Sequence, residues 1–140
     1  MGRKKPVKIP PSQKIEAFLD FLQEASEQYK EAREAVSVED KSLQDHLHDV
    51  EFARNADEEK ATGRALRESR RNRRRNKDRV QEVELIHNFF QEPMNRKTLN
   101  GIRQLLGNQR KREEYLYGDR HYTHRMRPEQ TDKENTDEKD

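Results

Sequence analysis

Residues 67–79 read Arg-Glu-Ser-Arg-Arg-Asn-Arg-Arg-Arg-Asn-Lys-Asp-Arg, and this stretch decides which fold the chain can adopt. It holds eight basic residues, two acidic residues and no apolar side chain, and it contains neither glycine nor proline. Apolar residues recur at helical spacing on both sides of it, in segments 61–66 and 80–90. We therefore expect residues 67–79 to form the polar middle of one long helix, which needs a partner surface along its length.

This long helix is predicted to begin after an Asn55 cap and to end near Gln91, because Glu92-Pro93 follows. Its contact seam is apolar at both ends and polar in the middle: Thr62, Leu66, Ser69, Arg73, Asn76, Val80, Val83, His87 and Phe90. Arg73 stands where an apolar residue is expected. It is therefore predicted to set the register of the helix against an acidic partner.

The preceding segment predicts an amphipathic helix that begins with Ser12 as its cap. Its apolar side chains recur every three or four residues: Ile15, Phe18, Leu19, Leu22, Ala25, Tyr29, Ala32 and Val36. A weak capping box, Ser37-Val38-Glu39-Asp40, suggests a break near 36–38 and a second helix with Leu43, Leu47 and Val50. The lack of glycine and proline leaves open a single helix that continues to about Arg54.

A last helix is predicted to start at an Asn95 cap and to finish before Gly118. Its stripe is Leu99, Ile102, Leu106 and Leu116. Gly101 and Gly107 weaken this helix relative to alanine, and the alternatives for Gly107 are that it ends the helix or permits close packing. The predicted fold is all-α, an elongated antiparallel helical bundle or coiled coil of three to four helices with disordered termini. The expected domains are a basic flexible arm at 1–11, one helical domain at 12–117, and a tail at 118–140 that is basic and aromatic, then acidic and disordered.

Charge is distributed unevenly along the chain, although the net charge is only +2. Residues 12–59 carry five basic and fourteen acidic groups, whereas residues 60–127 carry nineteen basic and eight acidic groups. The acidic half can fold back onto the basic helix, with Glu24, Glu27, Glu31, Asp45 and Asp49 as candidate partners for the inward arginines.

Basic side chains that are not paired in this way are candidates for binding nucleic acid, because arginine and lysine displace counterions from phosphates. The candidate residues for nucleic-acid or partner binding are Arg67, Arg70, Arg71, Arg74, Arg75, Lys77, Arg120, Tyr122 and Arg125. Among the helical positions, Arg70, Arg74 and Lys77 are expected to face away from the acidic half. The stretch 120–127 is basic and aromatic, which suits either nucleic acid or a docking tail.

No catalytic motif is present: the chain has no phosphate-binding glycine loop, no His-Glu-x-x-His and no nucleophile elbow. It also lacks cysteine, so thiolate metal sites are excluded, and His46 and His48 point to different sides of a helix. We expect no enzyme activity, no cofactor and no metal. Because no long apolar run exists, we expect no membrane contact, and the lack of cysteine suits a cytoplasmic location.

Three segments together resemble a known group of proteins. They are Arg70-Arg71-Asn72-Arg73-Arg74-Arg75-Asn76-Lys77-Asp78, then Leu105-Leu106-Gly107 with Arg110-Lys111-Arg112-Glu113, and Arg120-x-Tyr122-x-x-Arg125. In this order, over about residues 38–127, they resemble small helical proteins encoded by phages and prophages of Gram-positive bacteria. The resemblance implies a viral accessory protein of the bacterial cytoplasm that acts on DNA transactions or on host defence.

Three functions remain open at this point. The leading hypothesis is a non-enzymatic protein that binds nucleic acid, or a nucleic-acid–protein complex, through the basic helix. The alternatives are an interaction module, such as an inhibitor of a host defence nuclease, and a self-assembling structural adaptor. The expected partners are therefore nucleic acid, a nucleic-acid-binding host protein, or further copies of the chain as a homo-oligomer.

Overall fold

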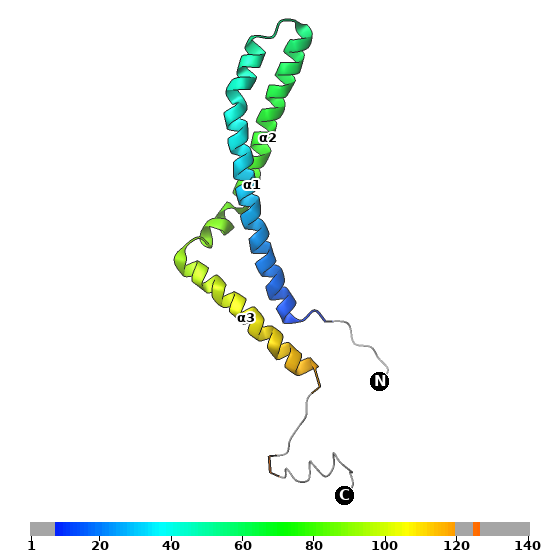
Figure 1. The fold of residues 1–140 in the computed structure, drawn as a ribbon, viewed down its shortest axis with the longest axis vertical. Coiled ribbons are helices and arrows are strands. Elements are labelled where there is room, and N and C mark those ends of the chain that lie inside the picture. The colour runs from blue at the N-terminus through cyan, green and yellow to red at the C-terminus, as the bar shows by residue number, and fades with distance from the viewer. Residues whose placement is uncertain (1–7, 120–124, 127–140) are drawn as a thin grey trace, which may run out of the picture.

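The fold is described by a computed structural model that covers residues 8–119 and 125–126. Within these residues it is all-α and contains three helices: α1 (Pro11–Glu51), α2 (Ala56–Phe89) and α3 (Pro93–Tyr117). This confirms the all-α prediction, and three helices are compatible with the predicted three to four. Helices α1 and α2 lie side by side and antiparallel, and α3 turns back toward the start of α1 (Figure 1).

Helix α1 is continuous over its 41 residues, so the predicted break at 36–38 is wrong and the single-helix alternative is right. Ser37 is half-buried inside this helix instead of capping a new one. The Ser12 cap is also wrong, since the helix begins at Pro11 with Pro10 as its cap. Ser12 is buried and turns its polar groups toward α3.

Helix α2 begins as predicted, because the Asn55 side chain accepts a hydrogen bond from the backbone N–H of Glu58 at 2.9 Å. Acidic residues in its first turn suit the helix dipole. All nine residues of the predicted seam, from Thr62 to Phe90, are buried or half-buried. The spacing of the sequence therefore identified the inner face of α2 correctly, including its polar middle.

Helix α3 begins at Pro93 with Glu92 as its cap, so the Asn95 cap is wrong. Asn95 instead donates from its side chain to the carbonyl of Phe89 at 2.9 Å. Gly107 neither ends the helix nor permits close packing, because a Cβ there would meet no other atom within 4 Å. Gly118 is the C-terminal cap, as expected.

A fixed contact between α1 and α3 replaces the missing cap of α1. The Glu113 carboxylate accepts from the Ser12 backbone N–H at 2.9 Å and from the Ser12 hydroxyl at 2.5 Å. Arg110 and Glu16 form an ion pair at 3.1 Å one turn away. A carboxylate of α3 thus satisfies one free backbone donor at the start of α1, the N–H of Ser12.

The apolar core is thin, as the composition predicts. Its buried apolar residues are Ala25, Ala32, Val83, Leu99 and Leu106. Phe18, predicted to lie on the inner stripe of α1, is instead 42% exposed. Tyr29 stacks on His87 near the end of α2, so the first turns of α1 extend past the last residue of α2 and contact α3 instead.

Candidate nucleic-acid interface

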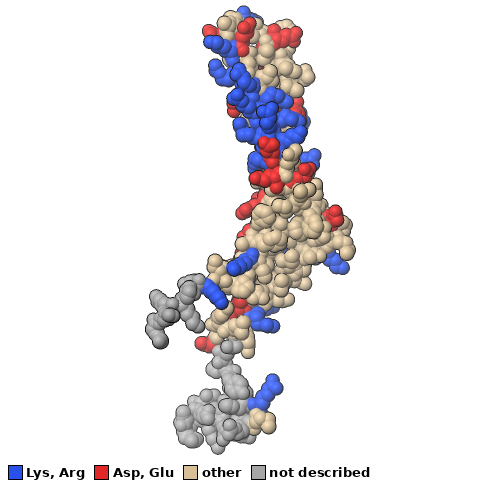
Figure 2. Space-filling view, turned by 180° about the vertical axis from the view of Figure 1, so that it is seen from behind, with Lys and Arg blue, Asp and Glu red and all other residues tan. Residues whose placement is uncertain are grey.

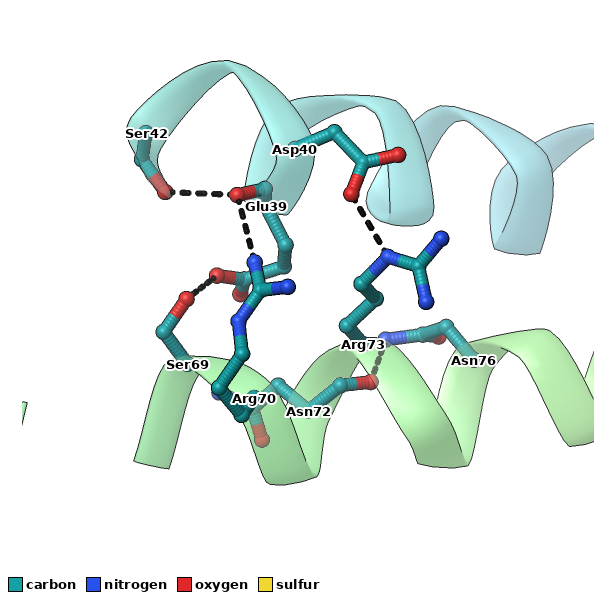
Figure 3. A network of polar contacts seen from close by, with 8 residues as sticks. All are labelled: Glu39, Asp40, Ser42, Ser69, Arg70, Asn72, Arg73 and Asn76. Carbon is teal, nitrogen blue, oxygen red and sulfur yellow. Dashed lines mark hydrogen bonds and ion pairs between the residues drawn. The ribbon is translucent and has the colours of Figure 1, made fainter. Parts of the chain in front are cut away.

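Polar contacts hold the middle of the α1–α2 hairpin together in place of an apolar core (Figure 3). The Ser69 hydroxyl donates to the Glu39 carboxylate at 2.5 Å, and Ser69 is only 4% exposed. The Arg73 guanidinium forms an ion pair with Asp40 at 2.5 Å. Arg73 therefore faces α1, as its seam position predicts.

The acidic partners differ from those expected. Glu39 and Asp40 contact α2, whereas the five acids proposed from the sequence are exposed and form no ion pair with arginine in the described part of the chain. Those five lie on the outer side of α1, because their spacing from Ala25 and Ala32 turns them away from α2. The length of α1 brings Glu39 and Asp40 level with Ser69 and Arg73 instead.

Arg70 was expected to face away from the acidic half, and the structure corrects this. Its guanidinium donates to the Glu39 carbonyl at 3.1 Å, and its Nε is buried without a partner. Arg70 is half-buried against α1 and is not free to bind a ligand with its whole side chain. Arg74, by contrast, is exposed as predicted.

An outer stripe of basic residues runs along the side of α2 that faces away from α1. Counting about 100° per residue, its members follow one another at steps of three and four. All are exposed, and within residues 8–119 none of their side chains donates a hydrogen bond or joins an ion pair: Lys60, Arg64, Arg67, Arg71 and Arg74. Figure 2 shows lysine and arginine gathered over the upper half of the hairpin.

Lys60 and Arg64 were missed as site residues by the sequence reasoning, which concentrated on the densest basic run. The signal was present, since Lys60, Arg64 and Arg67 stand at spacings of four and three on the helix that begins at Ala56.

A side groove of about 430 Å³ opens between the two helices next to this stripe. Four basic residues and one acid contribute to its lining: Arg33, Lys41, Arg73, Lys77 and Asp40. Lys77 is exposed and follows Arg74 by one helical turn, so the groove and the outer stripe form one continuous basic surface. The groove brings cations of α1, which lies in the acidic half of the sequence, beside those of α2.

The remaining predicted site residues have different surroundings. Arg75 is exposed but lies 3.6 Å from Glu68, which neutralises part of its charge. Arg125 is exposed. Arg120 and Tyr122 lie outside the described residues, so their proposed role stays a prediction.

His87 marks the lower end of the basic surface. It stacks on Tyr29 with ring centroids 4.0 Å apart, and Arg33 lies over the same tyrosine at 5.6 Å. Partial burial, and then the nearby charges of Lys30 and Arg33, lower the pKa of His87 below its ordinary value of 6.5. The histidine is therefore favoured in its neutral form and adds no positive charge near neutral pH.

Three further findings bear on function. Among the described residues, no cluster of three acidic or histidine side chains is placed to hold a metal ion. No helix within 8–119 has both the length and the apolar character needed to cross a bilayer. No family model, curated protein or solved structure matches this chain.

Proposed function

We propose that the protein binds nucleic acid through the outer stripe of α2 and the side groove between α1 and α2, without catalysing a reaction. The observation that carries this proposal is the outer stripe itself, a row of exposed cations with no partner within the described chain. The expected role as a phage accessory protein of the bacterial cytoplasm belongs to the same proposal.

The geometry of the stripe suits a phosphate backbone. From Lys60 to Arg74 it extends about 21 Å at 1.5 Å per residue. One strand of a duplex presents about six phosphates over that length, because they follow at about 3.4 Å along the axis. Cations without internal partners can release counterions from those phosphates at no cost to the fold.

The side groove would add a second row of contacts. Lys77 and Lys41 line it and have no ion-pair partner among the described residues, whereas Arg73 is engaged with Asp40. Point charges such as lysine ammonium groups bind phosphate without strict geometry. This favours binding that depends on charge and shape more than on base sequence.

A filter-binding titration against duplex DNA, single-stranded DNA and RNA at several salt concentrations tests the proposal. Replacing Arg67, Arg71 and Arg74 by alanine should lower the salt slope for duplex DNA by about 0.9 for each phosphate that the variant no longer neutralises. The matched control replaces Lys97, Lys111 and Arg112, which are three exposed cations of α3, and so removes the same charge. This control should keep the wild-type slope.

Two results would refute the proposal. The first is no binding by the wild-type protein at micromolar concentration and 50 mM salt. The second is an equal reduction of the slope in the stripe variant and the α3 control, which would show a response to net charge alone. Circular dichroism of both variants shows whether they remain helical, as expected for side chains that lack internal partners.

A protein-binding role is the second candidate, and the outer side of α1 favours it. Glu24, Glu27, Glu31, Asp45 and Asp49 are exposed there and would repel nucleic acid. Such a face suits a basic protein surface, for example that of a nucleic-acid-binding enzyme. A partner captured from host lysate, whose binding persists after nuclease treatment and after replacement of Arg67, Arg71 and Arg74, would support this role.

The coiled-coil packing of α1 against α2 that the sequence predicts stays a prediction.

A further inference from the structure

An apolar groove lies where α1 extends past the end of α2. Its volume is about 350 Å³, and every residue that lines it is apolar: Phe18, Phe21, Leu22, Leu85, Ile86, Phe89 and Phe90. Four of the five phenylalanines of the chain are therefore in one open surface feature. In a chain with 41% charged residues, this concentration needs an explanation.

The exposed area of this groove is large for a small monomer. Leu85 is 83% exposed, Phe89 54%, Phe21 46% and Phe18 42%. Taking about 200 Å² for each fully exposed large apolar side chain, these four expose about 450 Å² together. A standard interface buries about 800 Å² per partner, of which somewhat more than half is apolar, so the groove alone supplies that apolar share.

We propose that this groove is where a second copy of the chain docks. The two sides of the groove come from different helices, with Phe18 and Phe21 on α1 and Leu85 and Phe89 on α2. A two-fold axis would set the α1 side chains of one copy against the α2 side chains of the other. The patch is then self-complementary, as a two-fold symmetric interface requires.

The charges at the edge of the groove fit the same arrangement. Exposed Lys14 precedes Phe18 by one turn on α1, and exposed Glu82 precedes Leu85 by one turn on α2. When the α1 side of one copy pairs with the α2 side of the other, Lys14 of each copy comes near Glu82 of the other copy. The two-fold axis produces this pair of opposite charges two times. The core of one copy buries little apolar area, because two of its five buried apolar residues are alanines. Association of two copies would bury further apolar area and so stabilise the chain.

Sedimentation equilibrium of the full chain without nucleic acid tests the inference. We expect twice the chain mass of 16.8 kDa at tens of micromolar. Leu85→Asp should weaken the dimer by at least about 30-fold, since burying a leucine contributes a factor of about 10 to 100 and a buried aspartate opposes association. Leu85 is too exposed for this change to unfold the chain, and circular dichroism checks that.

The matched control is Phe52→Asp. Phe52 is 60% exposed and caps α1 at the far end of the hairpin, outside the groove. This variant should keep the dimer, as should the variant that lacks Arg67, Arg71 and Arg74, so that failure of nucleic-acid binding and failure of dimerisation are separate results. A wild-type monomer at 100 μM, or a dimer that Leu85→Asp leaves unchanged, would overturn the inference.

The chain has no cysteine, which permits a test of the arrangement. Phe18→Cys protein mixed with Leu85→Cys protein should form a disulfide-linked pair on oxidation. Mixtures in which Phe52→Cys replaces either one should not. Equal cross-linking in all mixtures would show random collision and would count against the groove as the interface.

Discussion

Two polar contacts in the middle of the hairpin should differ in strength because their burial differs. Ser69 is 4% exposed where it donates to Glu39. The side chains of Arg73 and Asp40 are 32% and 49% exposed, although the same distance of 2.5 Å separates their atoms. We predict that double-mutant cycles with alanine will give a larger coupling energy for Ser69 with Glu39 than for Arg73 with Asp40.

The expected magnitudes follow from the surroundings. A hydrogen bond to a charged group contributes about 1.5–3 kcal/mol, and since Glu39 is only half-buried we expect about 1.5 kcal/mol. An exposed ion pair contributes about 0.2–1 kcal/mol, so about 0.5 kcal/mol is expected for Arg73 with Asp40. Arg70 and Ser42 bind the main-chain oxygen of Glu39, so Glu39→Ala leaves those contacts in place.

Urea unfolding followed by far-ultraviolet circular dichroism at pH 7 measures both cycles. The Arg73–Asp40 coupling energy should also fall when salt is raised from 0.1 to 1 M. Over this range the Debye length shortens from about 10 Å to about 3 Å, so ions screen an exposed charge pair more strongly. The Ser69–Glu39 coupling should change little. Equal couplings, or a larger one for the ion pair, would refute the view that burial sets the energies here.

Three further predictions concern α3 and the lower hairpin. Gly107→Ala should raise the free energy of unfolding by about 0.5–1 kcal/mol, because the new Cβ meets no atom and alanine favours helix; a lower stability in urea would contradict this. Chiefly because the Ser12 hydroxyl donates to it, Glu113 has a pKa below its ordinary value of 4.5, so its stabilising effect is complete above pH 4.5 and is lost as pH falls through the lowered pKa. The protection factors of α3 amides, which correct the exchange rates for their intrinsic pH dependence, should therefore fall in acid, and Glu113→Gln should show low protection at all pH values; wild-type protection in that variant would count against the contact. The lowered pKa of His87 means that stability declines as pH falls below 6.5 and levels off below the folded-state pKa. His87→Phe, which keeps an aromatic ring beside Tyr29, should remove that decline, and an unchanged pH profile would show that another group causes it.

Much of the local structure could be predicted from residue spacing. The inner face of α2 was found correctly from Thr62 to Phe90, because the direction of a side chain depends on position within a helix and not on tertiary contacts. The Asn55 cap was found for a similar reason, since it acts within one turn. The exposed cations Arg67, Arg71 and Arg74 follow from the same periodicity once the inner face is known.

The register of the hairpin was not predictable in this way. It depends on whether α1 continues through Ser37, and a weak capping box suggested that it stops there. A continuous α1 places Glu39 and Asp40 opposite the basic middle of α2 and leaves Glu24 and Glu31 outside. Arg70 was misplaced for the same reason, because its half-buried position depends on which residue of α1 lies opposite.

The sequence by itself determined an all-α chain with a long basic helix, because charge pattern and helical period are local properties. The tertiary structure decided which of those charges are used inside the molecule: Arg73 and Arg70 contact α1, whereas Arg67, Arg71 and Arg74 stay exposed. It also decided that Phe18 lies in an open apolar groove, since the first turns of α1 extend past α2 and their contacts with α3 leave Phe18 exposed. These distinctions depend on the distances between helices, which a one-dimensional pattern does not contain.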